Sequence, residues 1–269
     1  MLENPRSPRV RAVAKLTKRA GRVETGLFLL EGPQSVSEAL QWRPEGVVEL
    51  FGTPTAFEKH PNIAEAAEAA GVPTVFVTED VLNAMADTVT PQGLVAVAQQ
   101  FPSSVKDIFA DGPRLVAICE EVRDPGNLGT IIRAADAAGA DAVVLTGRTV
   151  DLYNPKVVRA TTGSLFHLPI SVGGDLLSVR ERARAAGLRI IAADVKGEDL
   201  LEARASGVLA EPTAWLFGNE AHGLDDESLA LADLALRLPI YGSAESLNLA
   251  TAASVCLYES AFAQRAATQ

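Results

Sequence analysis

Short apolar runs alternate with helical patterns along most of the chain. The clearest case begins with an apolar run at Leu115–Cys119, which has the length of a buried strand, and continues into a turn at 124–127. Apolar side chains then recur at helical spacing up to Gly139, and a second apolar run covers Ala142–Leu145. This pattern predicts a βαβ unit, in which ligand-binding groups belong at the carboxyl end of the first strand.

The first hundred residues show the same alternation at shorter intervals, which predicts a small α/β domain. Strands are expected at 28–30, 47–51, 74–77 and 94–99, and helices at 10–20, 34–40, 63–70 and 81–86. After the βαβ unit, strands are expected at 188–192, 214–217 and 234–238, with helices at 176–186 and 247–264. The second half of the chain is therefore expected to form a mainly parallel α/β sheet.

A polar segment with two prolines and a glycine, FPSSVKDIFADGP, separates the two halves. The expected organisation is a basic arm at 1–25, a small domain at 26–100, a linker at 101–113 and a larger domain at 114–269.

The composition indicates a globular protein with a substantial core. Of 269 residues, 48% are hydrophobic, yet no apolar run is long enough to span a membrane and the first residues are charged rather than signal-like. Cys119 and Cys256 lie in apolar patterns without metal-ligand spacing. We expect two reduced core cysteines, no metal site, no membrane partner and a cytoplasmic protein.

The charge distribution is uneven. The net charge is −10, but residues 1–25 hold seven basic and two acidic side chains, so this arm carries +5 and the rest of the chain −15. A basic arm on an acidic body suggests contact with RNA or DNA. On one continuous helix, four of the cations would share a face: Lys15, Lys18, Arg19 and Arg22. A merely solvated amphipathic helix is an equally good interpretation of the charges alone.

The first of three unusual loops follows the strand at 115–119. It reads Asn127-Leu-Gly129-Thr-Ile-Ile-Arg133, in which the glycine permits close approach to the first helical turn. Taken alone it is a weak signal, because Asn127 could be only a helix N-cap and Arg133 could pair with Asp136.

Two further loops follow later strands. In the second, Gly218 and Gly223 flank Glu220, whose carboxylate needs a partner, with Arg133 as the candidate; an ordinary turn is the alternative. The third leads into the last helix through Ser246 and Asn248, which could merely cap that helix. No dinucleotide-binding glycine fingerprint, P-loop or nucleophile elbow is present.

Together, the three loops resemble in type, order and spacing the signature motifs of the SpoU (TrmH-type) RNA ribose 2′-O-methyltransferases of the SPOUT superfamily. The stretch Asn154–Gly163 resembles the segment that links these motifs. Phe28–Gly32 and Pro91–Ala96 resemble the N-terminal L30e-like RNA-binding domain of many members, so the resemblance covers essentially the whole chain. Two positions depart from the family pattern, which often has methionine at Ile240 and serine at Ala250.

The resemblance implies an α/β trefoil-knot (SPOUT) methyltransferase domain with a mainly parallel sheet, a smaller L30e-like α/β domain and a homodimer with the active site near its interface. It implies S-adenosylmethionine as cofactor and RNA, first of all 23S ribosomal RNA, as substrate. The residues it marks as catalytic are Arg133, Asn127, Glu220, Ser246 and Asn248, and those it marks as cofactor-binding are Gly218, Leu238, Ile240 and Leu247.

In this scheme Arg133 acts on the ribose 2′-hydroxyl and is held by Asn127 and Glu220. We favour an electrostatic stabiliser of the developing alkoxide over a general base, because a guanidinium keeps its proton far above neutral pH. Ser246 and Asn248 would orient the substrate.

Other interpretations remain open at this point. The substrate could be tRNA, or the protein could be a non-catalytic RNA-binding protein of the same fold. A nucleotide-dependent oxidoreductase rests on the βαβ pattern alone.

Overall fold

The computed structural model describes residues 1–267. Its chain folds into two compact units. One unit combines Met1–Phe101 with Asp151–His167, and the other combines Pro102–Val150 with Leu168–Gln269. The segments expected as the arm and the small domain fall in one unit, and nearly all of the expected linker falls in the other. Segment 151–167, expected in the larger domain, joins the N-terminal unit. As functional domains, the boundaries expected from the sequence stay a prediction.

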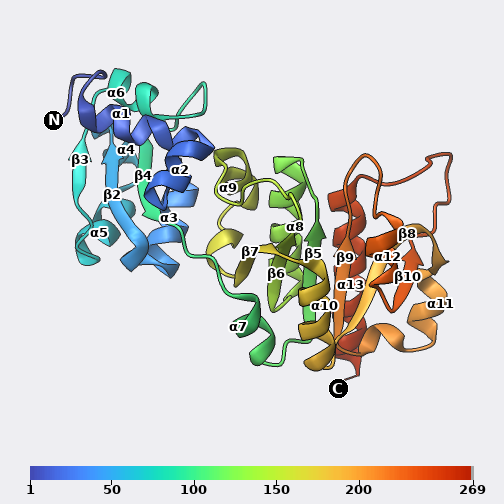
Figure 1. Ribbon diagram of the computed structural model, residues 1–269. Helices are drawn as coiled ribbons and strands as arrows, with labels where there is room; N and C mark the ends of the chain where they lie inside the picture. Colours follow the sequence, from blue (N-terminus) through green and yellow to red (C-terminus); the bar gives the residue numbers. More distant parts are fainter. Residues whose placement is uncertain (268–269) are drawn as a thin grey trace. The chain divides into compact units, whose positions relative to one another are not determined.

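The N-terminal unit is built on a four-stranded sheet of order β1-β4-β2-β3, in which only β2 and β3 are parallel (Figure 1). Its strands are β1 (Leu27–Glu31), β2 (Val47–Gly52), β3 (Thr74–Phe76) and β4 (Leu94–Gln99). Its helices are α1 (Pro8–Ala14), α2 (Arg19–Thr25), α3 (Pro33–Trp42), α4 (Pro54–Lys59), α5 (Pro61–Ala69), α6 (Glu79–Met85) and α9 (Pro155–Thr161), with short 3-10 turns at Lys15–Thr17, Pro44–Gly46 and Ser164–Phe166.

The basic arm does not form the single helix that was expected. A 3-10 turn follows α1, and Lys18 has an extended backbone before α2 begins. The apolar side chains Val10, Val13 and Leu16, which precede the break, pack into the core of the N-terminal unit. The expectation that four cations share one helical face is therefore wrong.

The second unit contains a six-stranded sheet of order β10-β8-β9-β5-β6-β7, in which all neighbouring strands are parallel (Figure 1). Its strands are β5 (Leu115–Glu120), β6 (Ala142–Thr146), β7 (Ile170–Gly174), β8 (Arg189–Asp199), β9 (Thr213–Phe217) and β10 (Leu234–Arg237). Its helices are α7 (Val105–Ala110), α8 (Pro125–Ala138), α10 (Leu176–Ala185), α11 (Leu200–Ala205), α12 (Asp226–Ala230) and α13 (Leu249–Ala266), with a 3-10 turn at Val208–Ala210.

This sheet confirms the expected mainly parallel architecture. The central strands are buried on both faces, as their near-continuous apolar sequences require. From β5 the chain continues to β6 and β7 on one side and then crosses to β8, β9 and β10 on the other side, so the strand order reverses beside β5. Ligands of open parallel sheets bind at such a switch point, outside the carboxyl ends of the strands. Within the described residues, no helix is long and apolar enough to cross a membrane.

Candidate active site

The loop after β9 is folded back on itself. Asn219 and Gly223 exchange two backbone hydrogen bonds of 3.0 and 2.9 Å, and the side chain of Asn219 donates to the carbonyl of Glu121. A Cβ on Gly218 would lie 2.6 Å from the backbone of Gly223. Only glycine permits this approach, so the expected importance of Gly218 has a steric basis.

Glu220, which this loop presents, binds the start of α8. Its two carboxylate oxygens accept hydrogen bonds from the backbone N–H groups of Arg123 and Asp124, at 3.1 and 3.0 Å. No hydrogen bond or ion pair within residues 1–267 joins it to Arg133. The expectation of a Glu220–Arg133 pair is therefore wrong for the single chain; the positive end of a helix supplies the partner instead.

Asn127 does not cap α8, because Asp124 does so by accepting from the backbone N–H of Asn127 at 2.8 Å. The side chain of Asn127 is thereby left for longer-range contacts. Its Nδ2 donates to Glu220 at 3.3 Å, and its Oδ1 accepts from Asn248 Nδ2 at 2.9 Å. A hydrogen-bonded chain, Glu220–Asn127–Asn248, therefore connects all three loops.

Asn248 has two functions at once. Its Oδ1 caps α13 by accepting from the backbone N–H groups of Ala250 and Thr251, at 2.9 and 3.2 Å. Its Nδ2 makes the link to Asn127. The cap alone would explain an asparagine at this position, but not the link between loops.

A pocket of about 390 Å³ lies beside this chain of hydrogen bonds. Five of the site residues expected from the sequence line it, namely Glu220, Leu238, Ile240, Ser246 and Leu247. Arg133, Asn127, Gly218 and Asn248 are outside its lining. The volume is within the range of small-molecule sites.

One wall of the pocket comes from a segment that the sequence pattern did not predict. Strand β8 was expected to end at 192, but it continues to Asp199 and contributes Asp194, Val195 and Lys196 to the lining. The missed signal is Gly197, where an added Cβ would lie 2.4 Å from the backbone of Ala235 in β10. A glycine in a polar strand often marks such a close approach of two backbones.

Arg133 lies on the exposed side of α8, opposite the buried stripe of Leu128, Ile131 and Ile132. Residues six positions apart on a helix do not share a face. The side chains of Asn127 and Arg133 therefore lie on different faces of α8, although both residues belong to the first loop motif.

Ionisable groups at the carboxyl end of β5 have shifted pKa values. Arg123 lowers the pKa of Glu121 through a hydrogen bond and through its positive charge, and Arg148 acts in the same two ways. Burial, reinforced by neighbouring carboxylates, raises the pKa of Glu120, whose Oε2 is buried without a hydrogen-bond partner. Burial raises the pKa of Cys119 to about 12, so this thiol is unreactive at neutral pH.

The four cations expected to bind RNA fall into two groups. Lys15, Lys18 and Arg19 are exposed. Arg22 is 3% exposed and pairs with Asp151 at 2.6 Å, while its Nη1 donates to the carbonyl of Leu16 at 2.7 Å. Arg22 therefore holds the arm against the segment 151–167 within the N-terminal unit.

The acidic side chains of the second unit do not form a metal site. Among residues 1–267, no cluster of three His, Cys, Asp or Glu side chains has an arrangement that could hold a metal ion.

Comparison with known proteins decides the family. Residues 114–258 match the model of the SpoU rRNA methylase family. The chain belongs to the SpoU rRNA methylase family. Residues 7–96 match a second model, described as an MRM3-like substrate-binding domain.

Relatives named as 23S rRNA 2′-O-methyltransferases align over nearly the whole chain. A 23S rRNA (guanosine(2553)-2′-O)-methyltransferase of Bacillus subtilis is 36% identical, over 96% of this chain and 97% of its own. A 23S rRNA (uridine(2479)-2′-O)-methyltransferase of Streptomyces viridochromogenes is 32% identical, over 91% of this chain and 86% of its own.

The AdoMet-bound rRNA methyltransferase structure from Sinorhizobium meliloti superimposes with a TM-score of 0.81 at 32% identity, over 96% of both chains. These findings confirm the expected α/β SPOUT fold class, the RNA methyltransferase class and S-adenosylmethionine as the cofactor of this SpoU protein.

Proposed function

We propose that this SpoU protein methylates the 2′-hydroxyl of a ribose in large-subunit ribosomal RNA. The observation that carries the proposal is the chain Glu220–Asn127–Asn248, which fixes three loops around one pocket. Preorganised loops are what a transfer reaction requires, because correct placement of the reacting groups supplies much of the rate.

The pocket suits S-adenosylmethionine in size and chemistry. Its walls combine apolar side chains such as Leu238, Ile240 and Leu247 with polar ones such as Lys196 and Ser246. The apolar residues and the backbone of the Gly218 loop would hold the adenosine part. When bound, the cofactor supplies a methyl group activated by its sulfonium charge.

Arg133 serves the nucleophile in this proposal. A ribose hydroxyl attacks only as its proton leaves, and a nearby guanidinium stabilises the negative charge that develops on oxygen. Asn127 and Glu220 maintain the start of α8, the helix that carries Arg133. Ser246, an exposed residue of the pocket lining, would orient the ribose.

Because Arg133 is outside the pocket of its own chain, we propose a homodimer in which a second copy completes the site. An exposed apolar stripe on α13, formed by Val255, Tyr258 and Phe262, supports this. The hydroxyl of Tyr258 donates to the carbonyl of Ala137, one helical turn beyond Arg133 on α8. The stripe and Arg133 thus belong to adjoining faces of two packed helices.

Sedimentation analysis tests the dimer. Phe262→Glu should shift the protein toward monomer and reduce methyl transfer, whereas Leu177→Glu, at a similarly exposed apolar position on α10, should do neither. A wild-type protein that sediments as a monomer at micromolar concentration would refute the dimer.

Three exposed cations in the arm, Lys15, Lys18 and Arg19, support a polyanionic substrate. The names of the relatives favour ribosomal RNA over tRNA. We include a cytoplasmic location in the same proposal, because the enzyme would encounter its ribosomal RNA substrate in the cytoplasm.

The test is methyl transfer from labelled S-adenosylmethionine to purified ribosomal RNA or tRNA, followed by mapping of 2′-O-methyl positions. Label on a large-subunit ribose is expected. Label on a base or only on tRNA would contradict the proposal. Cofactor binding by calorimetry without any transfer would favour the non-catalytic alternative.

A further inference from the structure

A buried carboxylate in the N-terminal unit organises the exposed loop between α6 and β4, residues 87–92. The side chain of Glu31, at the end of β1, is 4% exposed. Its Oε2 accepts from the backbone N–H groups of Asp87 and Thr88, at 3.2 and 3.1 Å, and from the Thr88 hydroxyl at 2.8 Å. The start of the loop is thus fixed by one buried oxygen.

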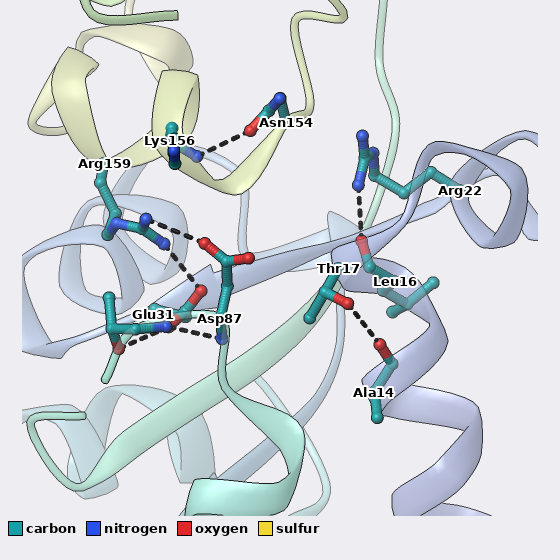
Figure 2. A network of polar contacts seen from close by, with 10 residues as sticks. Ala14, Leu16, Thr17, Arg22, Glu31, Asp87, Asn154, Lys156 and Arg159 are labelled. Atoms are coloured by element: carbon teal, nitrogen blue, oxygen red, sulfur yellow. Dashed lines mark hydrogen bonds and ion pairs between the residues drawn. The ribbon is translucent and has the colours of Figure 1, made fainter. Parts of the chain in front are cut away.

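The charge of Glu31 is balanced by Arg159 of α9. Arg159 donates through Nη1 to Glu31 Oε1 at 2.9 Å and through Nη2 to the carboxylate of Asp87 at 3.0 Å (Figure 2). A buried carboxylate without a partner is strongly destabilising, so the loop anchor depends on this arginine. Arg159 lies 128 positions from Glu31 in the sequence, in the segment that the second half of the chain contributes to the N-terminal unit.

The far end of the loop is held as well. The carbonyl of Gly93 accepts from the backbone N–H of Thr53 and the carbonyl of Leu94 accepts from that of Gly32, both at 3.0 Å. Between these fixed ends, Val89 is 100% exposed, and Thr90 is exposed too. A fully exposed valine on an anchored loop contributes nothing to packing within the chain, and binding residues are common on loops that a rigid scaffold positions.

The charge around this loop does not oppose contact with a polyanion. Residues 88–92 carry no ionisable side chain, and the single positive charge of Arg159 is shared between the two carboxylates at the base of the loop, Glu31 and Asp87. Lys156, exposed one turn earlier on α9, adds a cation on the same side of the helix (Figure 2). With Lys156 included, the two cations balance the two carboxylates, so this surface is locally neutral. In a chain of net charge −10, a locally neutral surface repels RNA less than the acidic remainder does.

We propose that the 87–92 loop contacts the substrate RNA and that Arg159 is the residue that positions this loop. The inference rests on the proposed function for the identity of the RNA and deepens it. An unpaired nucleotide is the part of the RNA that this loop would bind. Unpaired bases are splayed out, so the face of the base can pack on Val89 while its edge forms hydrogen bonds with polar groups of the loop.

The RNA contact is tested by filter binding of large-subunit rRNA transcript, which requires no methyl transfer. Val89→Glu places a negative charge at the tip without disturbing a packed residue. It should weaken RNA binding about tenfold, the scale on which a single specific interaction with RNA affects affinity. Val48→Glu, at an exposed valine on β2 of the same unit, is the matched control and should bind like wild type.

The positioning role is tested with Arg159→Ala. Hydrogen exchange of the Asp87 and Thr88 amides should accelerate about tenfold or more, because their acceptor is no longer held. KM for RNA should rise while kcat at saturating RNA and cofactor affinity stay unchanged. Arg159→Lys should recover part of the affinity, since one ammonium cannot replace both guanidinium hydrogen bonds.

The double variant Glu31→Gln/Arg159→Ala removes the unpaired charge and should restore protection of the two amides relative to Arg159→Ala. Unchanged RNA affinity in Val89→Glu would overturn the RNA contact. Equal loss of RNA binding, cofactor binding and kcat in Arg159→Ala would overturn the positioning role. The RNA-binding, cofactor-binding and hydrogen-exchange measurements do not depend on methylation, so a wild type that binds RNA but leaves it unmethylated would instead refute the proposed function.

Discussion

Asn127 and Asn248 are 121 positions apart in the sequence, yet their side-chain amides are joined by a hydrogen bond of 2.9 Å. The bond fixes the orientation of both amides, because Asn127 must also donate to Glu220 and Asn248 must also cap α13. The loops that follow β5, β9 and β10 are thus held in a single arrangement next to the pocket.

Two substitutions at Asn248 should separate its functions. Asn248→Ala removes the cap and the link, and should lower the free energy of unfolding by about 1 kcal/mol as well as reduce turnover. Asn248→Asp keeps an effective cap but replaces the donor toward Asn127 with a carboxylate. Its unfolding free energy should stay near wild type while turnover falls, as urea denaturation and single-turnover assays would reveal. Wild-type turnover in Asn248→Asp would show that the link is dispensable.

Arg133→Ala should decrease turnover by about two orders of magnitude or more, the scale for loss of a transition-state stabiliser. Cofactor affinity measured by calorimetry should not change, because Arg133 does not line the pocket. Arg148→Ala is the control, since it removes another exposed arginine of the same unit. If both variants turn over like wild type, Arg133 has no part in the reaction.

Replacing Lys15, Lys18 and Arg19 with alanine should weaken RNA binding and flatten its dependence on salt. The logarithmic slope should decrease by about 0.7 to 0.9 for each phosphate that is no longer neutralised. Substitution is preferable to deletion of the arm, because Val10, Val13 and Leu16 belong to the core. Affinity would be measured across a salt series. Parallel slopes for wild type and the triple variant would mean that these cations are merely solvated.

Arg22→Ala serves as the contrast within the arm. It should destabilise the N-terminal unit, since it removes the partner of Asp151 and a hydrogen bond to the carbonyl of Leu16. The salt slope of RNA binding should not change, because a buried guanidinium does not reach phosphate.

Glu120→Gln should make the protein more stable at neutral pH. Burial raises the pKa of Glu120, so its ionised form is disfavoured in the folded state relative to the unfolded state. This penalty is absent below the unfolded pKa, near 4.5, grows as pH rises above it, and is complete above the folded pKa. The gain should be below about 1 kcal/mol, because the group is only partly buried and water screens it.

Thermal unfolding of both proteins between pH 4 and pH 8 checks this dependence. The difference in Tm should be positive at pH 8 and shrink toward zero at pH 4. A constant difference across the range would attribute the effect to packing rather than to charge.

The sequence by itself determined the central strands and the long helices of the second unit, since runs such as Leu115–Cys119 are apolar enough to be buried whatever surrounds them. It did not predict the short helices α7, α11 and α12 or the extension of β8 to Asp199. It also determined which polar residues follow those strands, and hence which loops meet at one edge of a parallel sheet. Periodicity, glycine placement and residue type are local properties, and they are sufficient for this much.

Only the tertiary structure decided how those residues are used. Asp124 took the cap that Asn127 could have provided, and the helix N-terminus took the place of Arg133 beside Glu220. Arginine side chains such as those of Arg22 and Arg159 are usually expected at the surface. Each of these two nevertheless pairs with a carboxylate more than a hundred positions away in the sequence. Such pairings depend on which segments the fold brings together and on the cost of leaving a buried charge alone, and no local pattern encodes either.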